Sequence, residues 1–130
     1  MDRSEVLETL LDYYQSPRNY GEMADADVSL QGGNPGCGDI VTMYLKFNGD
    51  QLDKVTYTGE GCTISQAAAS MLTEILPGKT IEQIEAMDYH LIEDLLGEEL
   101  VKTRPKCSTL GLDTVKFATQ EYLRNQRQAE

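Results

Sequence analysis

Three cysteines and one aspartate, far apart along the chain, have side chains that suit a shared chemical task. They are Cys37, Asp39, Cys62 and Cys107. Three cysteines cannot all form disulfides within one chain, so at least one thiol is free. Thiolates combined with a carboxylate suit a borderline-soft metal ion or an iron–sulfur cluster. The pattern therefore predicts one metal or cluster site, and the alternative is that the thiols are small buried apolar groups.

The first ligand segment places two candidate ligands close together. Cys37 and Asp39 are two residues apart, so in an extended segment both side chains point to the same side and one metal could take both. Gly36 and Gly38 would give this loop freedom to move. Such freedom suits a site that exchanges metal or sulfur rather than one that holds a permanent structural zinc. The chain has no Cys-x-x-Cys pair, so spacing alone is not a zinc signature.

The other two cysteines each precede an expected helix start. Residues 63–66 after Cys62 match a capping box, and Ser108 after Cys107 is a plausible helix cap. Helix N-termini carry unpaired N–H groups and a partial positive charge, so a thiolate there is stabilised. These positions suit metal ligation and sulfur nucleophilicity, and placement alone leaves inert burial as an equal alternative.

Periodicity indicates the elements that must hold these side chains. Alternating apolar residues predict strands over 28–30, 40–47 and 52–58. Apolar residues at helical spacing predict helices over 4–15, 63–75, 80–86, 90–96 and 108–124, with a fraying polar tail after them. This order predicts an α+β fold: a small antiparallel three-stranded sheet with helices packed on one face and the ligand loops at one end.

Length and charge narrow the class of protein. The chain has 130 residues, which suggests a single domain over 1–130 with its own core. Its net charge of −11 disfavours nucleic acid and anionic membrane surfaces as partners. No apolar run approaches the roughly 20 residues that span a bilayer. The first residues lack the apolar core of a signal peptide, so we expect a cytoplasmic location, where thiols stay reduced.

Four sequence motifs around these residues form a recognisable set. They are Leu11-Asp12-Tyr13-Tyr14 with Pro17-Arg18-Asn19, then Asn34-Pro35-Gly36-Cys37-Gly38-Asp39, Gly59-Glu60-Gly61-Cys62-Thr63-Ile64-Ser65, and Lys106-Cys107-Ser108-Thr109-Leu110. They are spread along the chain from residue 11 to residue 110. The set resembles the U-type iron–sulfur scaffold family, which comprises IscU, SufU and the N-terminal domain of NifU.

The resemblance implies a role in sulfur traffic. Cys37, Cys62 and Cys107 would ligate a [2Fe–2S] cluster or Zn²⁺ at the same site, and Asp39 would be a ligand or tune cluster release. A pyridoxal-phosphate cysteine desulfurase would deliver persulfide sulfur, with Cys37 as the acceptor, and apo iron–sulfur proteins would receive the cluster. On this reading the protein is a scaffold rather than a true enzyme. The alternatives are a SufU-type zinc-dependent sulfurtransferase and, from another class, a structural zinc module.

The sequence mixes features of two subfamilies. Lys106 stands where IscU-type members carry histidine, and Arg104 with Lys106 resembles SufU; both would add positive charge near Cys107 and modulate the site. However, only 44 residues separate Cys62 from Cys107 (63–106), which is close to IscU, whereas SufU has an insertion there. The Leu-Pro-Pro-Val-Lys segment that IscU presents to its chaperone is absent. The resemblance is therefore mixed between IscU and SufU.

Overall fold

A sheet and six helices make up the described part of the protein. The computed structural model describes residues 3–34 and 38–129. The elements follow in the order α1 (Arg3–Gln15), β1 (Val28–Asn34), β2 (Asp39–Asn48), β3 (Gln51–Glu60), α2 (Thr63–Ile75), α3 (Ile81–Ala86), α4 (Tyr89–Leu96), α5 (Glu98–Thr103) and α6 (Pro105–Ala129). None of the helices in this part of the chain is both long and apolar enough to cross a membrane.

The sheet is a meander in which each strand pairs with the next. Its order is β1-β2-β3, and both pairings are antiparallel. Along β2, Val41, Met43 and Leu45 are fully buried, while the residues between them face the other side. The turn between β2 and β3 uses Gly49 at φ +65°, a conformation that glycine adopts without strain. The predicted three-stranded antiparallel sheet is confirmed.

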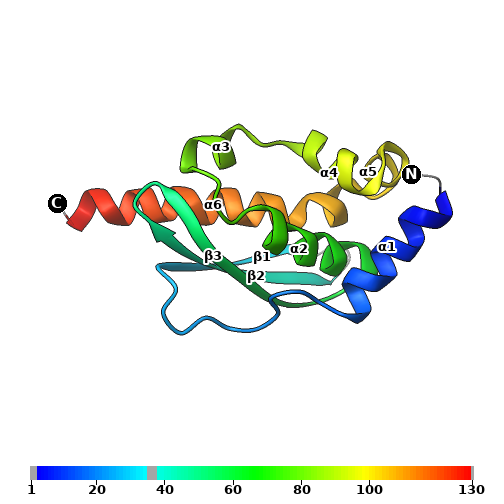
Figure 1. Ribbon diagram of the computed structural model, residues 1–130, viewed down its shortest axis with the longest axis horizontal. Helices are drawn as coiled ribbons and strands as arrows, with labels where there is room; N and C mark the ends of the chain where they lie inside the picture. Colours follow the sequence, from blue (N-terminus) through cyan, green and yellow to red (C-terminus); the bar gives the residue numbers. More distant parts are fainter. Residues whose placement is uncertain (1–2, 35–37, 130) are drawn as a thin grey trace.

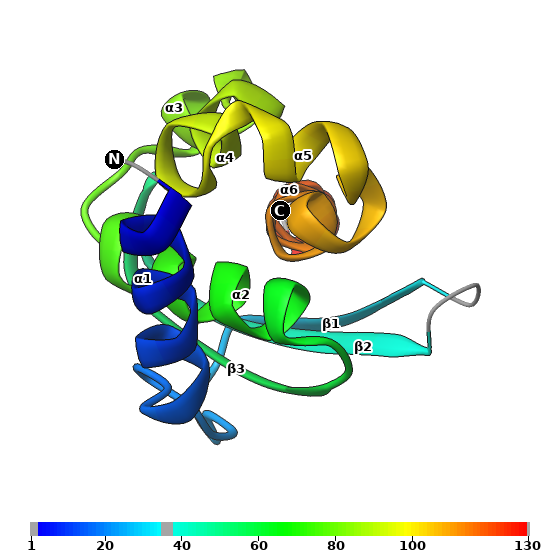
Figure 2. The same ribbon diagram turned by 90° about the vertical axis from the view of Figure 1, so that its right-hand side faces the viewer.

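The helices form layers on one side of this sheet. Helices α2 and α6 pack on the sheet, α1 packs beside α2, and α3 to α5 lie farther out over α6 (Figures 1 and 2). In Figure 2 the opposite face of the sheet carries none of the described helices. This arrangement confirms the predicted α+β fold with helices on one face.

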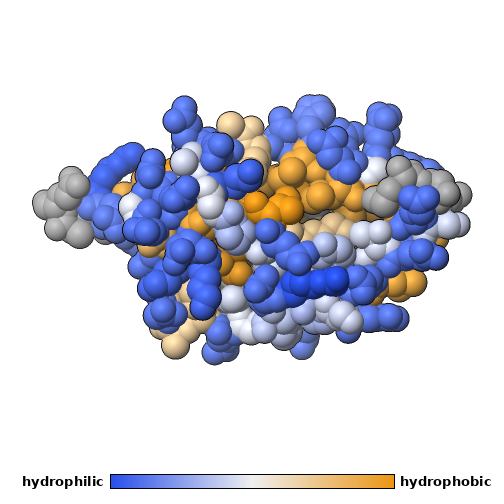
Figure 3. Space-filling model, viewed as in Figure 1, coloured by the Kyte–Doolittle hydropathy of each residue, from blue (hydrophilic) through white to orange (hydrophobic). Residues whose placement is uncertain are grey.

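Charged and polar residues cover much of the outer surface. In Figure 3 polar residues dominate the rim of the view, and apolar residues gather near its middle, where α2, α4 and α6 lie in Figure 1. The core beneath is built from the inner face of the sheet and the apolar sides of the helices, with Tyr57, Met43, Leu72 and Leu112 among its largest buried side chains. The core therefore fixes α2 and α6 relative to β2, and three of the candidate ligands, Asp39, Cys62 and Cys107, lie on these elements or at their ends.

The first strand is longer than the predicted 28–30, because two glycines continue it. Gly32 pairs with Val41, and α6 crosses this point closely. A Cβ atom on Gly32 would stand 2.0 Å from Oγ1 of Thr114. The absence of a side chain at Gly32 thus allows α6 to approach the strand, and β1 runs on to Asn34.

The start of α2 differs from its prediction. The helix begins at Thr63 with Cys62 as its N-cap residue, and no side chain caps it. The predicted capping box over 63–66 is wrong, because the Gln66 amide donates instead to the Ile40 carbonyl oxygen and to Ser65 Oγ. The helix ends at Ile75, just before the Pro77-Gly78 stop signal.

The last two helices also depart from expectation. Helix α6 begins at Pro105 rather than Ser108, since proline fits the first position of a helix, where its missing N–H leaves no bond unmade. It continues to Ala129, so the tail that we expected to fray is helical. The six-residue α5 was not predicted, and no side chain caps it. As a consequence, Cys107 lies inside the first turn of α6.

Candidate metal centre

Three of the four predicted ligands come together from three separate elements. Asp39 is the first residue of β2, Cys62 is the N-cap of α2 and Cys107 lies in the first turn of α6. One ligand atom from each, a carboxylate oxygen or a sulfur, lies within 4.8 Å of the others. The fourth predicted ligand, Cys37, lies outside the described residues. Its place in the site stays a prediction.

Asp39 lies at the centre of the cluster. Its side chain is buried, and Oδ1 accepts the Cys62 N–H at 2.7 Å. Its Oδ2 atom is 3.0 Å from Cys107 Sγ and 3.7 Å from Cys62 Sγ. Burial by itself would raise the pKa of Asp39, but the bonds from Cys107, Cys62 and Ser65 outweigh it, so the pKa is lowered. The carboxyl group is therefore held in its charged form, which is the form that binds a metal.

The backbone between β3 and α2 is shaped to admit this carboxylate. Ile40 pairs with Glu60, so the start of β2 lies beside the end of β3. The next residue, Gly61, has φ +142°, and a Cβ there would stand 2.2 Å from Oδ1 and 2.9 Å from Cα of Asp39. Only glycine fits such a position without displacing the main chain. Gly61 therefore lets the Cys62 N–H reach Asp39.

The two described thiols have different surroundings. Cys107 is buried, while Cys62 is partly exposed at the helix terminus. Ser65 Oγ, one turn after Cys62, donates to the Cys62 carbonyl oxygen at 3.1 Å and lies 3.7 Å from its sulfur. Sequence reasoning did not single out Ser65. The available signal was a hydroxyl three residues after a cysteine at a helix start, a spacing that brings the two side chains together.

The two cationic residues near Cys107 face outward. Arg104 is the C-cap of α5, Lys106 follows Pro105 in α6, and both are exposed. Lys106 lines a groove of about 1150 Å³ between α4, α5 and α6, and Gly33 of β1 also borders it. The predicted effect of these two cations on Cys107 stays a prediction.

The chemistry of the donor set fits either of the expected occupants. Two sulfurs and one buried carboxylate supply three of the four ligands that tetrahedral zinc takes. Sulfur-rich sets also hold iron–sulfur clusters. With Cys37 as a fourth ligand, as the resemblance implies, the set would be complete for both.

Comparison with known proteins agrees with the geometry. Residues 5–129 match the family model of the NifU-like N-terminal domain. The chain is 36% identical over 115 residues to the iron–sulfur cluster assembly scaffold protein IscU 1 of Archaeoglobus fulgidus, a match that covers 88% of this chain and 74% of the relative. It is 34% identical over 121 residues to the zinc-dependent sulfurtransferase SufU of Bacillus subtilis, covering 80% of this chain and 82% of the relative.

A solved structure shares both the fold and part of the sequence. The crystal structure of a putative iron–sulfur cluster assembly scaffold protein for the SUF system from Fervidobacterium islandicum AW-1 superimposes with a TM-score of 0.73 at 28% identity. The match covers 91% of this chain and 99% of that one. The expected mixture of IscU-like and SufU-like similarity is confirmed, and the chain belongs to the NifU-like N-terminal domain family of iron–sulfur cluster scaffold proteins.

Proposed function

We propose that this protein accepts sulfur from a cysteine desulfurase, assembles a [2Fe–2S] cluster on Cys37, Asp39, Cys62 and Cys107, and passes it to apo-proteins. The observation that carries the proposal is the convergence of Asp39 and two thiols, within 4.8 Å, from three elements of a scaffold-family fold. The cluster is the cargo of this process. We place the process in the cytoplasm, where the thiols stay reduced.

The two kinds of ligand would do different work during transfer. Thiolates suit iron in a sulfide-bridged cluster, whereas a carboxylate is a hard ligand and binds such iron weakly. Asp39 is held charged among the sulfurs, so it can complete the coordination without making it permanent. Buried Cys107 would stay bound to the cluster iron while the bond from Asp39 to iron breaks. A site of this kind holds a cluster and also releases it.

Sulfur would enter by thiol exchange. In this step the Cys37 thiolate attacks the terminal sulfur of the desulfurase persulfide, the old S–S bond breaks, and the desulfurase cysteine leaves as a thiolate. The sulfane sulfur then needs two electrons to become sulfide, and an external reductant must supply them. Acceptance at Cys37 rests on the family resemblance.

Anaerobic reconstitution tests the scaffold function. The protein would be incubated with ferrous iron, L-cysteine, a pyridoxal-phosphate cysteine desulfurase and dithiothreitol as the reductant. We expect the visible absorption and circular dichroism of a [2Fe–2S] cluster to appear, and not to appear in Cys107→Ser. A parent protein that retains only zinc and never forms a cluster would overturn this proposal.

A zinc-dependent sulfurtransferase is the second candidate. It is favoured by the similarity to the Bacillus subtilis protein of that name and by Lys106 in place of histidine. Here Asp39, Cys62 and Cys107 would stay on zinc while Cys37 carries the sulfur. Mass spectrometry after incubation with a desulfurase would show added sulfur on Cys37. Unchanged desulfurase turnover on adding the protein would contradict this function, and an unreactive Cys37 would favour a purely structural zinc module.

A further inference from the structure

A buried hydroxyl lies against the sulfur of Cys62. Ser65 is fully buried in the first turn of α2, with Oγ 3.7 Å from Cys62 Sγ and 3.1 Å from the Cys62 carbonyl oxygen. A hydroxyl has a single hydrogen to donate and two lone pairs that accept. Which atom receives this hydrogen therefore matters for the charge on the neighbouring sulfur.

Gln66 fixes the direction of the Ser65 hydrogen bond. The Gln66 side chain lies 3.4 Å from the Ile40 carbonyl oxygen and 3.1 Å from Ser65 Oγ. The Ile40 oxygen can only accept, so the amide nitrogen must face it, and the same nitrogen donates to Ser65 Oγ. With that bond accepted, Ser65 turns its own hydrogen toward the acceptors on its other side, which are the Cys62 carbonyl oxygen, the Cys62 sulfur and the Asp39 carboxylate.

The room for this amide is provided by another glycine. A Cβ on Gly59 would stand 2.7 Å from Gln66 Oε1 and 2.4 Å from the Ile40 carbonyl oxygen. The chain from Ile40 through Gln66 and Ser65 to Cys62 thus links strand β2 to the ligand at the start of α2. Its members are held by the sheet and the helix, so the hydroxyl position is fixed before any metal binds.

Deprotonation of Cys62 changes what its sulfur can do. As a thiol, Cys62 donates toward Ser65 Oγ and Asp39 Oδ2. A metal binds the thiolate, which has no hydrogen and can only accept. The Ser65 hydroxyl is then a neutral donor next to this sulfur, and its hydrogen can be shared among the sulfur, the Cys62 carbonyl oxygen and the Asp39 carboxylate.

We propose that Ser65 is a positioning residue that donates a hydrogen bond to the metal-bound sulfur of Cys62 and so weakens the electron donation of this ligand. The inference rests on the proposed function, since it needs Cys62 to bind metal. Hydrogen bonds to ligand sulfurs are one of the factors that set the reduction potential of iron–sulfur clusters. The bond withdraws charge from the sulfur, so a reduced cluster is stabilised and the sulfur-to-metal charge-transfer energy rises.

Cobalt substitution detects the hydrogen bond from Ser65 to the Cys62 sulfur without requiring cluster assembly. Cobalt(II) would be added to the apo-protein in the absence of air, and the sulfur-to-cobalt charge-transfer band recorded. We expect Ser65→Ala to shift this band to longer wavelength, while Ser65→Thr, which keeps the hydroxyl, returns it to the parent position. In a reconstituted cluster the reduction potential of Ser65→Ala should be lower than that of the parent.

A matched control separates the bond from the loss of any buried hydroxyl. Ser70 lies five residues after Ser65 in α2 and is also fully buried. Its Oγ accepts a hydrogen bond from the Arg18 N–H instead of lying next to a ligand. Ser70→Ala should leave the band at the parent wavelength. Gln66→Met removes the donor that orients Ser65 and should give a smaller shift in the same direction as Ser65→Ala. It also tests the inference if Ser65→Ala does not fold.

The failure of this inference differs from the failure of the proposed function. If cobalt does not bind, or if its band is unchanged in Cys62→Ser, then Cys62 is not a ligand and the proposed site is wrong. If cobalt binds through Cys62 but the band of Ser65→Ala, or of Gln66→Met should Ser65→Ala not fold, stays at the parent wavelength, the hydrogen bond is refuted and the site stands. Equal shifts in Ser65→Ala and Ser70→Ala would also refute it.

Discussion

Helix α2 takes part in two polar clusters that differ in what completes them. The thiol pocket at its N-terminus consists of Asp39, Cys62, Ser65 and Cys107. The α1 latch lies farther along the helix and consists of Asp12, Tyr13, Arg18, Asn19, Ser70 and Thr73. Both clusters connect segments that are far apart in the sequence. They differ in whether their own side chains supply partners for their donors and charged groups.

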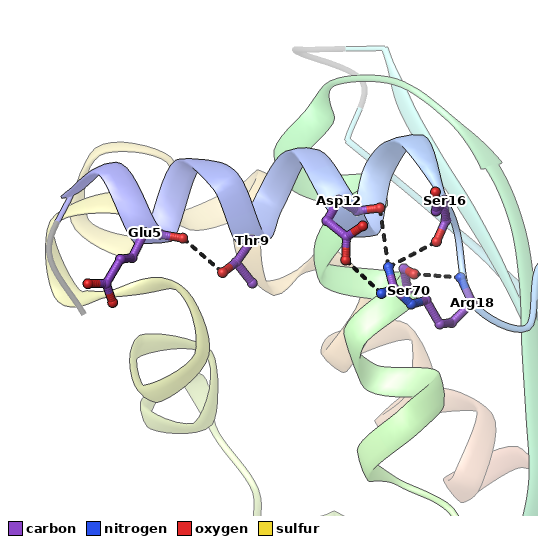
Figure 4. A network of polar contacts seen from close by, with 6 residues as sticks. All are labelled: Glu5, Thr9, Asp12, Ser16, Arg18 and Ser70. Atoms are coloured by element: carbon purple, nitrogen blue, oxygen red, sulfur yellow. Dashed lines mark hydrogen bonds and ion pairs between the residues drawn. The ribbon is translucent and has the colours of Figure 1, made fainter.

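The α1 latch matches its donors with acceptors. The Arg18 N–H donates to Ser70 Oγ at 2.9 Å, and the Arg18 guanidinium pairs with Asp12 at 2.6 Å (Figure 4). The same guanidinium lies 4.1 Å from the centre of the Tyr13 ring. Asn19, at φ 53°, donates through its amide to Thr73 Oγ1. The donors here meet acceptors within the cluster, and the one guanidinium has a carboxylate partner, so folding alone completes the cluster.

The thiol pocket gathers groups that become anions. Once its thiols lose their protons, two sulfurs and a carboxylate lie within 4.8 Å of one another, two of the three residues buried. Like charges so close in a poorly hydrated place repel strongly, and a cation removes that cost. The latch is therefore a structural device, whereas the thiol pocket would be completed by a bound cation, as proposed above. The predictions below test this division.

The largest effect should come from removing a thiol of the pocket. In the zinc form, Cys62→Ser and Cys107→Ser should each reduce zinc affinity by more than the roughly 10–100-fold that an outer-shell partner costs. Cys37→Ser should lose much less zinc affinity, because Cys37 is the ligand that we predict is released from the zinc. Competition titration with a chelator measures all three. Equal losses of zinc affinity in the three variants would contradict this ranking.

The next effect should come from filling the space beside Asp39. In Gly61→Ala the new Cβ would clash with the Asp39 carboxylate and with its main chain, which cannot retreat. We expect zinc affinity to fall about 10–100-fold, as for the loss of an orienting partner.

Gly97→Ala is the matched control for the Gly61 variant. Gly97 also has a positive φ, +94°, but a Cβ there meets nothing within 4 Å. Gly97→Ala introduces backbone strain of the same kind but makes no contact with the thiol pocket. Its zinc affinity should therefore equal that of the parent. A similar loss of affinity in both variants would show that strain, not the Asp39 contact, is responsible.

A smaller effect, in the opposite direction, is expected for Asp39→Ala. Removing the weak carboxylate ligand should make a bound [2Fe–2S] cluster decay more slowly than in the parent, because the labile bond is gone. Loss of visible absorption over time, in the presence of an apo-acceptor, measures this rate. Equal decay in both proteins would refute the role of Asp39 in release.

The smallest effect should come from the α1 latch. Ser70→Ala removes the acceptor of the Arg18 N–H and should lower the free energy of unfolding by about 1 kcal/mol. Zinc affinity should not change. Urea unfolding and the chelator titration measure the two quantities. A loss of zinc affinity without a loss of stability would contradict the division between latch and pocket.

Much of the fold was predictable because its signals are local. The alternation along 40–47 reports a strand with one buried face, and the helical spacing around Leu72 reports a helix on the core. Contacts made in three dimensions were not predictable. Gly32 lies beyond the predicted strand 28–30 but accommodates Thr114 within the longer strand, and Gln66 was predicted to cap a helix but binds the Ile40 carbonyl.

The ligands of the candidate site could be predicted from the sequence, but the residues that position these ligands could not. The types and local settings of Asp39, Cys62 and Cys107 indicated a shared site, and these three do lie together. The helical position of Cys107 depends on Pro105 starting α6, which propensity alone does not decide. The role that we propose for Ser65 depends on where Gln66 points, which only the packing of β2 against α2 reveals.

The metal and acid-labile sulfide content of the protein purified without air decides whether Asp39, Cys62 and Cys107 hold a metal or a cluster. We expect iron and sulfide in equal amounts in the parent, and loss of both in Cys62→Ser and Cys107→Ser. Stoichiometric zinc without sulfide, lost in the same variants, would select the sulfurtransferase over the cluster scaffold. A folded parent that holds neither iron nor zinc would contradict the claim that Asp39, Cys62 and Cys107 form a metal centre.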